Sequence, residues 1–235
     1  MRDARQSQIG RFVIKKERNP RNLSIPTRRS VLLIAVVVGV ALGLFSLLEG
    51  DVGGRLFGIV GNIASPWGLA AFFVGYRATS RRQGALAGGL ALVVGVATYY
   101  LGSAVRGYVP TDLNVLWTVV ALVAGPIMGA CGAAVSTRPA RPPVLAVAAP
   151  AALLVAEALF LMYDRRPWAW NLSAETYRLI DLGVAVAMIV GGLVLPWVFV
   201  KEPRQRGIAY LVVAVAGTFG AFAFVLLERI IVAVV

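Results

Sequence analysis

Seven long stretches of the chain are apolar around the whole helical circumference. A surface helix of a soluble protein would instead carry a polar stripe with a period of 3.6 residues. A bilayer core about 30 Å thick needs roughly 20 apolar residues in a helix. The sequence therefore predicts an all-α, polytopic transmembrane bundle of seven spans, which are Val31–Leu48, Leu56–Tyr76, Ala85–Ser103, Leu113–Ser136, Val144–Tyr163, Leu179–Val200 and Ile208–Leu227.

The composition of the 235 residues supports this assignment and narrows the chemistry. Hydrophobic residues make up 59% and charged residues 14%, which leaves too little polar sequence to cover a soluble fold of this size. The chain has no histidine, so imidazole metal sites and His-activated nucleophiles are excluded. A single cysteine cannot form an internal disulfide or a multi-thiolate zinc site. We therefore expect no enzyme activity, no catalytic residue, no metal and no cofactor.

The distribution of arginine and lysine predicts the orientation of the chain. If the chain crosses the membrane seven times, one side of the membrane holds the first 30 residues and the turns at 77–84, 137–143 and 201–207. These segments contain 17 of the 23 basic residues. The positive-inside rule places that side in the cytoplasm. We therefore expect a cytoplasmic N-terminus and an external C-terminus.

The chain divides into a basic cytoplasmic tail, residues 1–30, and a seven-helix transmembrane domain, residues 31–235. Each basic residue near an anionic leaflet adds about 1 kcal/mol of attraction, so lipid headgroups are the expected partner of the tail. Phe12 is the one aromatic residue within the tail. We therefore expect no nucleic-acid partner.

Small residues four positions apart predict close helix contacts. Ala35, Gly39 and Gly43 share one face of the first span, the third and fourth spans carry glycine pairs at the same spacing, and the seventh span carries a pair three positions apart. These faces predict packing within the chain, and contact with another membrane protein or a second copy is the alternative. Pro66 and Pro126 interrupt two spans, where neighbouring helices can satisfy the freed carbonyl groups.

Polar residues inside the predicted spans are candidates for function. Glu157 lies about 9 Å below the outer surface of its span at a rise of 1.5 Å per residue. An ionisable group at that depth is costly in lipid and usually faces the bundle interior. Three interpretations are open for Glu157: a function, a structural contact (either a hydrogen bond or an ion pair, with Arg106 as a candidate), and a chance position facing lipid. Asn62 and Ser65 share a face at a similar depth.

Aromatic residues gather at the same depth. Tyr99, Tyr100 and Trp117 lie toward the outer side, where they are either interface anchors or the walls of a pocket. Combined with the polar groups, they give a hypothetical ligand-binding set of Asn62, Ser65, Trp67, Tyr99, Tyr100, Arg106, Trp117 and Glu157.

Six short motifs follow one another in a fixed order, namely Asn62-x-x-Ser65-Pro66-Trp67, Tyr99-Tyr100, Arg106-Gly107, Trp117, Gly125-Pro126-x-x-Gly129-x-x-Gly132 and Glu157-Ala158-Leu159. With this set of motifs, the chain resembles an uncharacterised family of small bacterial polytopic membrane proteins. The resemblance covers about 100 residues, from Asn62 to Tyr163, and leaves the tail and the last two spans outside. It implies a multi-pass protein of the bacterial cytoplasmic (inner) membrane and names no reaction.

The chain is also similar to the substrate-binding membrane subunits of energy-coupling-factor vitamin transporters. Those are small Ala/Gly/Val-rich bundles that bind a solute near the outer face, but they usually have six spans with both termini inside. The similarity implies that Ala35, Gly39 and Gly43 form a docking face.

Two functions follow from these observations. The first is a small-solute-binding or transport component with an outward-facing polar pocket, in which Glu157 and Asn62 are the polar anchors. The second is a structural or assembly protein that acts through helix contacts without a ligand. A membrane hydrolase that uses paired carboxylates would need Glu157 and Asp181 to meet.

Overall fold

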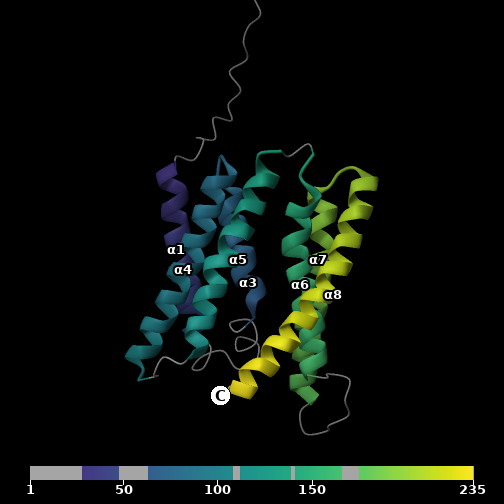
Figure 1. The fold of residues 1–235 in the computed structure, drawn as a ribbon. Coiled ribbons are helices and arrows are strands. Elements are labelled where there is room, and N and C mark those ends of the chain that lie inside the picture. The colour runs from purple at the N-terminus through teal and green to yellow at the C-terminus, as the bar shows by residue number, and fades with distance from the viewer. Residues whose placement is uncertain (1–27, 48–62, 108–111, 139–140, 166–174, 235) are drawn as a thin grey trace, which may run out of the picture.

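The computed structural model describes residues 28–47, 63–107, 112–138, 141–165 and 175–234. All the regular secondary structure in these ranges is α-helical, as predicted (Figure 1). The helices are α1 (Arg28–Leu47), α3 (Ala64–Tyr76), α4 (Arg81–Val105), α5 (Asp112–Ser136), α6 (Val144–Arg165), α7 (Glu175–Phe199) and α8 (Pro203–Val234).

Six of these helices are long and apolar enough to cross a membrane: α1, α4, α5, α6, α7 and α8. The fold is therefore that of a multi-pass membrane protein. The seventh described helix, α3, is by itself too short to cross a membrane, because its 13 residues extend about 20 Å and fall short of a full bilayer core. The sequence predicts a second span over Leu56–Tyr76, of which residues 56–62 lie outside the described part of the chain.

The helices form two groups that meet along α3, α5 and α6 (Figure 1). In one group, α4 packs against both α1 and α5, and α3 packs against α4 and α5. In the other group, α6 packs against both α7 and α8. The lower part of α8 in Figure 1 slants across the space between the two groups. Because α3 contacts α6 as well as its own group, residues of α3 and α6 can meet in the interior.

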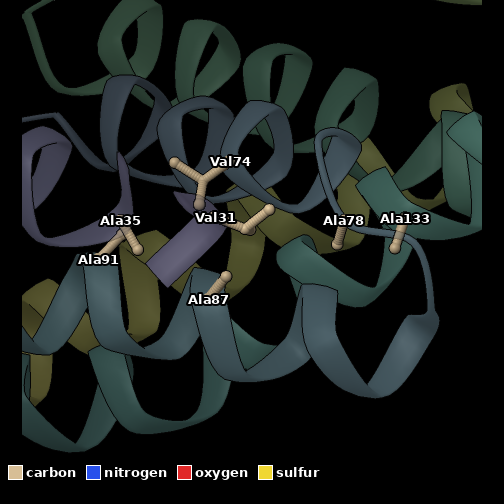
Figure 2. Close-up of a cluster of buried hydrophobic side chains, with 7 residues drawn as sticks. All are labelled: Val31, Ala35, Val74, Ala78, Ala87, Ala91 and Ala133. Atoms are coloured by element: carbon tan, nitrogen blue, oxygen red, sulfur yellow. The ribbon is translucent and has the colours of Figure 1, made fainter. Parts of the chain in front are cut away.

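Small side chains make the core of the first group. Val31, Ala35, Val74, Ala78, Ala87, Ala91 and Ala133 form one buried cluster contributed by α1, α3, α4, α5 and the turn after α3 (Figure 2). Six of the seven are less than 5% exposed, and none is larger than valine. Lipid tails are as apolar as these side chains, so close packing of the helices holds the group together.

Glycines bring the helix backbones into direct contact. A Cβ atom on Gly129 would collide with the carbonyl of Gly84, and one on Gly132 would collide with the carbonyl of Phe72. A Cβ on Gly88 would lie 2.8 Å from the Cα of Gly129. The glycine faces therefore serve packing within the chain, as the first interpretation of the sequence holds.

The expected docking face of the first span is wrong. Gly39 and Gly43 lie against α4, where a Cβ on Gly39 would come 2.9 Å from the Cβ of Val94. Ala35, on the same face, is fully buried. Because α4 covers this face, it is closed to another protein.

The outer surface of the bundle is apolar. Leu33, Val37, Leu101, Phe219 and Phe222 are each at least 60% exposed. Side chains of this kind on the perimeter of a helix bundle are suited to contact with hydrocarbon and not with water.

Candidate functional site

The carboxylate of Glu157 on α6 caps the N-terminus of α3. Its Oε2 accepts a hydrogen bond of 2.7 Å from the backbone amide of Ser65 and a second one from the Ser65 hydroxyl, and its Oε1 accepts one from the backbone amide of Ala64. Both oxygens of the carboxylate are thus engaged by the first two residues of α3. Glu157 is 4% exposed and Ser65 is 1% exposed.

This cap solves a problem that the position of α3 creates. The N-cap residue, Ile63, has an extended backbone and no side-chain hydrogen bond to the helix. The first amides of any helix lack intrahelical partners, and each costs several kcal/mol if it is left unpaired in lipid. A carboxylate also lies favourably at the positive end of the helix dipole. Glu157 therefore stabilises a helix that begins inside the bundle.

Pro66 supports the same helix start. It lies in the first turn of α3, where a proline removes no intrahelical hydrogen bond and its fixed φ suits the helix. The sequence predicts that Pro66 interrupts a longer span, and in the structure it marks the beginning of α3.

Arg106 does not pair with Glu157. It is the C-cap residue of α4, and its Nη1 donates a hydrogen bond of 2.6 Å to the carbonyl oxygen of Leu47 at the end of α1. Among the described residues, the hydrogen bonds of Glu157 go to Ala64 and Ser65. Of the two structural contacts left open for Glu157, the geometry therefore supports the hydrogen bonds and not the candidate ion pair with Arg106.

A cavity of about 310 Å³ lies beside the start of α3. Four residues of the predicted ligand-binding set line it, namely Trp67, Tyr99, Tyr100 and Trp117. They come from α3, α4 and α5, so three helices supply its aromatic walls. We call this the aromatic cavity.

The aromatic walls are held by their neighbours. The rings of Tyr99 and Tyr100 meet edge to face with centroids 5.6 Å apart. Tyr100 also forms a side-chain hydrogen bond with Thr118 of α5. The indole of Trp67 lies over Gly95, where a Cβ would be 2.7 Å from the ring. The glycine therefore makes the space that Trp67 occupies.

Apart from Ser46, the rest of the lining is apolar, and it includes residues that the sequence does not single out. Leu153 comes from α6, and Phe224 and Leu227 come from the C-terminal half of α8. Nothing in the apolar pattern of the last span distinguishes these positions. Their role depends on α8 crossing toward α3 and α5, which is a property of the tertiary fold.

The chemistry of the aromatic cavity is that of binding. Among the described residues that line it, the polar groups are Ser46, the two tyrosine hydroxyls and the two indole N–H groups. Aromatic walls with a few polar groups are typical of sites for small ligands, whose volumes run from about 300 to 1,000 Å³. Glu157 is not among the lining residues, since its carboxylate is turned to α3.

The predicted set thus separates into three parts. Trp67, Tyr99, Tyr100 and Trp117 share the aromatic cavity, and Ser65 and Glu157 form the helix cap beside it. Arg106 lies at the end of α4. Asn62 lies outside the described residues. Ala64 joins the first two parts, because its amide donates to Glu157 and the residue also lines the cavity.

One protein-family model matches most of the chain. A family of unknown function (DUF6518) matches residues 23–231, which extends beyond the range Asn62–Tyr163 recognised in the sequence and includes the last two spans and the end of the tail. No curated protein and no solved structure matches the chain.

Proposed function

The chain belongs to this family of unknown function, and from its own site we propose that it binds a small ligand in the aromatic cavity. It would act as a binding or transport component of a membrane. The observation that carries the proposal is the meeting of Trp67, Tyr99, Tyr100 and Trp117 around one space. Residues that served only as interface anchors would have no reason to enclose a common volume.

The capped start of α3 favours the same function. Helices that begin inside a membrane bundle are a recurring feature of solute sites in transporters, because their ends supply polar groups at the depth of the ligand. Here the first residue of α3, Ala64, borders the cavity, while Glu157 holds the helix in place. Glu157 is therefore a positioning residue in this proposal, and the direct polar contacts of a ligand come from the tyrosines and tryptophans.

The proposal includes the topology expected from the sequence. We infer seven crossings, with α3 as the second, a cytoplasmic N-terminus and an external C-terminus, in a bacterial cytoplasmic membrane. The basic turns between α3 and α4, α5 and α6, and α7 and α8 lie at the same end of the bundle as the start of α1, which supports this orientation (Figure 1). The aromatic cavity, near the opposite end, would then face outward.

The proposed function involves neither catalysis nor a cofactor, and its partners are lipids. A chain without histidine and with one cysteine fits a binding role. The basic residues 1–30 are proposed to touch anionic lipid headgroups and not nucleic acid. A membrane-protein partner or a second copy would contact a surface other than the covered face of α1.

Equilibrium dialysis of 2-naphthol tests the proposal. This probe combines a flat aromatic body with one hydroxyl group, and the protein is placed in phosphatidylcholine nanodiscs with empty nanodiscs as the blank. We expect saturable binding to the wild type that Trp117→Ala weakens about tenfold or more, because the substitution removes one aromatic wall. Trp197→Phe is the matched control, since Trp197 is 64% exposed on the perimeter. Trp197 neither lines the aromatic cavity nor belongs to the Glu157 cap of α3.

The alternative function predicts a different result. A structural or assembly protein without a ligand would show the same non-saturable uptake as empty nanodiscs, and Trp117→Ala would change nothing. That outcome would overturn the proposed function.

A further inference from the structure

A second hollow lies next to the aromatic cavity, between α6 and α8. Its volume is about 290 Å³, and we call it the α6–α8 groove. Leu153, Phe224 and Leu227 line both the groove and the aromatic cavity. The two spaces therefore adjoin, and these three side chains form the boundary between them.

The groove exists because small residues line its floor and sides. Ala152 and Ala156 come from α6, and Ala216, Gly220 and Ala223 come from α8. Ala216 and Ala223 are exposed, so the groove opens to the outside of the bundle. On the same helix Phe219 and Phe222 are 72% and 65% exposed. The medium outside the groove is therefore the hydrocarbon that these side chains contact.

The chemistry of both spaces selects the occupant. Apart from the tyrosine hydroxyls, no described residue that lines either space carries an ionisable side chain. The polar groups are confined to the aromatic cavity, at Ser46, Tyr99, Tyr100 and the two indoles. A ligand that fills both spaces would thus need one long apolar part and one small uncharged polar part.

The size of the groove excludes a bulkier occupant. An α-helix with its side chains is about 10–12 Å across, and a space of about 290 Å³ between two packed helices has no room for one. A single hydrocarbon chain is narrow enough to lie along alanine and glycine positions. A membrane lipid chain therefore fits the groove better than a partner helix.

We infer that the ligand of the aromatic cavity is a single-chain, uncharged amphiphile dissolved in the bilayer, which enters sideways between α6 and α8. The inference rests on the proposed function, since it identifies the ligand class of the same cavity. The polar end of the molecule lies among Tyr99, Tyr100 and Ser46, and its chain passes Phe224 and Leu227 into the groove.

Photolabelling tests this route. The probe is 1-hexadecanol with a diazirine near the middle of its chain, where the proposed pose passes the boundary between the two spaces, added to the protein in phosphatidylcholine nanodiscs, and peptide mapping locates the adducts. We expect adducts on residues of the groove and the cavity boundary, such as Leu153 and Phe224, in addition to the lipid-exposed Phe219. Excess unlabelled 1-hexadecanol should compete at the boundary residues and much less at the perimeter.

Two alanine-to-leucine substitutions on α8 form a test variant and its matched control. Ala223→Leu fills the groove from an exposed position, and we expect it to lower the boundary adducts about fivefold, because the added side chain occupies the space of the ligand. Ala214→Leu makes the same change at an exposed position that lines neither space, and it should leave the labelling unchanged. Adducts on Phe219 report that both variants are folded and embedded.

Labelling confined to the perimeter, or boundary adducts that Ala223→Leu leaves intact, would overturn the inference. Binding of 2-naphthol separates this failure from that of the proposed function. If 2-naphthol binds in the cavity while hexadecanol labels the perimeter alone, the lateral route is wrong and the binding function stands. If neither probe reaches the cavity, both are wrong.

Discussion

Glu157 and Ser65 are 92 residues apart in sequence, and the Glu157 carboxylate accepts hydrogen bonds from both the backbone amide and the hydroxyl of Ser65. The contact joins α6 to the first turn of α3 and thereby connects the two groups of helices. It also fixes the position of Trp67, which follows two residues later in α3 and forms a wall of the aromatic cavity.

Removing this carboxylate should destabilise the protein. Glu157→Ala leaves two amides and one hydroxyl without a partner in the interior, and we expect the free energy of unfolding to fall by about 3 kcal/mol or more. Glu157→Gln keeps one acceptor oxygen and should lose less. The measurement is steric-trap unfolding in bicelles. Glu202→Ala, at an exposed position, is the control and should unfold like the wild type.

An equal unfolding free energy for Glu157→Ala and the wild type would contradict the capping role. The carboxylate would then be replaceable by water or by another group near the start of α3.

Glycine contacts lead to a second prediction. Gly129→Ala places a methyl group against the backbone of Gly84 and 2.9 Å from the Cα of Gly88, so α4 and α5 must separate. We expect a loss of about 2 kcal/mol, measured by thermal unfolding in detergent. Gly183→Ala on α7 meets nothing within 4 Å and should be neutral or slightly stabilising. Equal effects of the two substitutions would contradict the packing described for α4 and α5.

The space over Gly95 controls the shape of the aromatic cavity. Gly95→Ala pushes the indole of Trp67 away, since the new methyl group would lie 2.7 Å from the ring. We expect the affinity for 2-naphthol to change about fivefold in equilibrium dialysis, because one wall is displaced. Gly207→Ala, in open space at the start of α8, is the matched control. Unchanged affinity in Gly95→Ala would mean that Trp67 is not a wall of the binding site.

Cysteine labelling tests the proposed topology. After Cys131→Ala removes the single native thiol, cysteines are introduced separately at two exposed positions at opposite ends of the bundle, Tyr163 and Lys201. We expect a membrane-impermeant maleimide to label Tyr163→Cys on intact cells. The same reagent should label Lys201→Cys only after the cells are permeabilised. The reverse pattern would place the basic turns outside and contradict the inferred orientation.

Much of the fold could be predicted from the sequence, because membrane helices are recognised by length and apolar composition. The expected span Val144–Tyr163 corresponds closely to α6 (Val144–Arg165), and Leu113–Ser136 corresponds to α5 (Asp112–Ser136). The depth of Glu157 also identified it correctly as a buried residue. Each of these features depends on local sequence alone.

The partner of Glu157 could not be predicted in the same way. An apolar run such as Leu56–Tyr76 does not reveal where a helix begins inside it, and the sequence offered Arg106 as a plausible counter-ion. The one local signal was Pro66, which favours the first turn of a helix. The contact itself depends on the packing of α6 against α3, which no short-range pattern encodes.

The glycine face of α1 shows the same limit. The spacing of Ala35, Gly39 and Gly43 correctly indicated close helix contact, but spacing carries no information about which helix makes it. The structure assigns the contact to α4 of the same chain.

The central claim is that a ligand occupies the aromatic cavity, and crystallography with 6-bromo-2-naphthol tests it most directly. The anomalous signal of bromine locates the probe without any assumption about its pose. We predict a bromine peak within the cavity, between the rings of Trp67 and Trp117. Bromine peaks confined to the lipid-facing perimeter, with none among the four aromatic walls, would contradict the account.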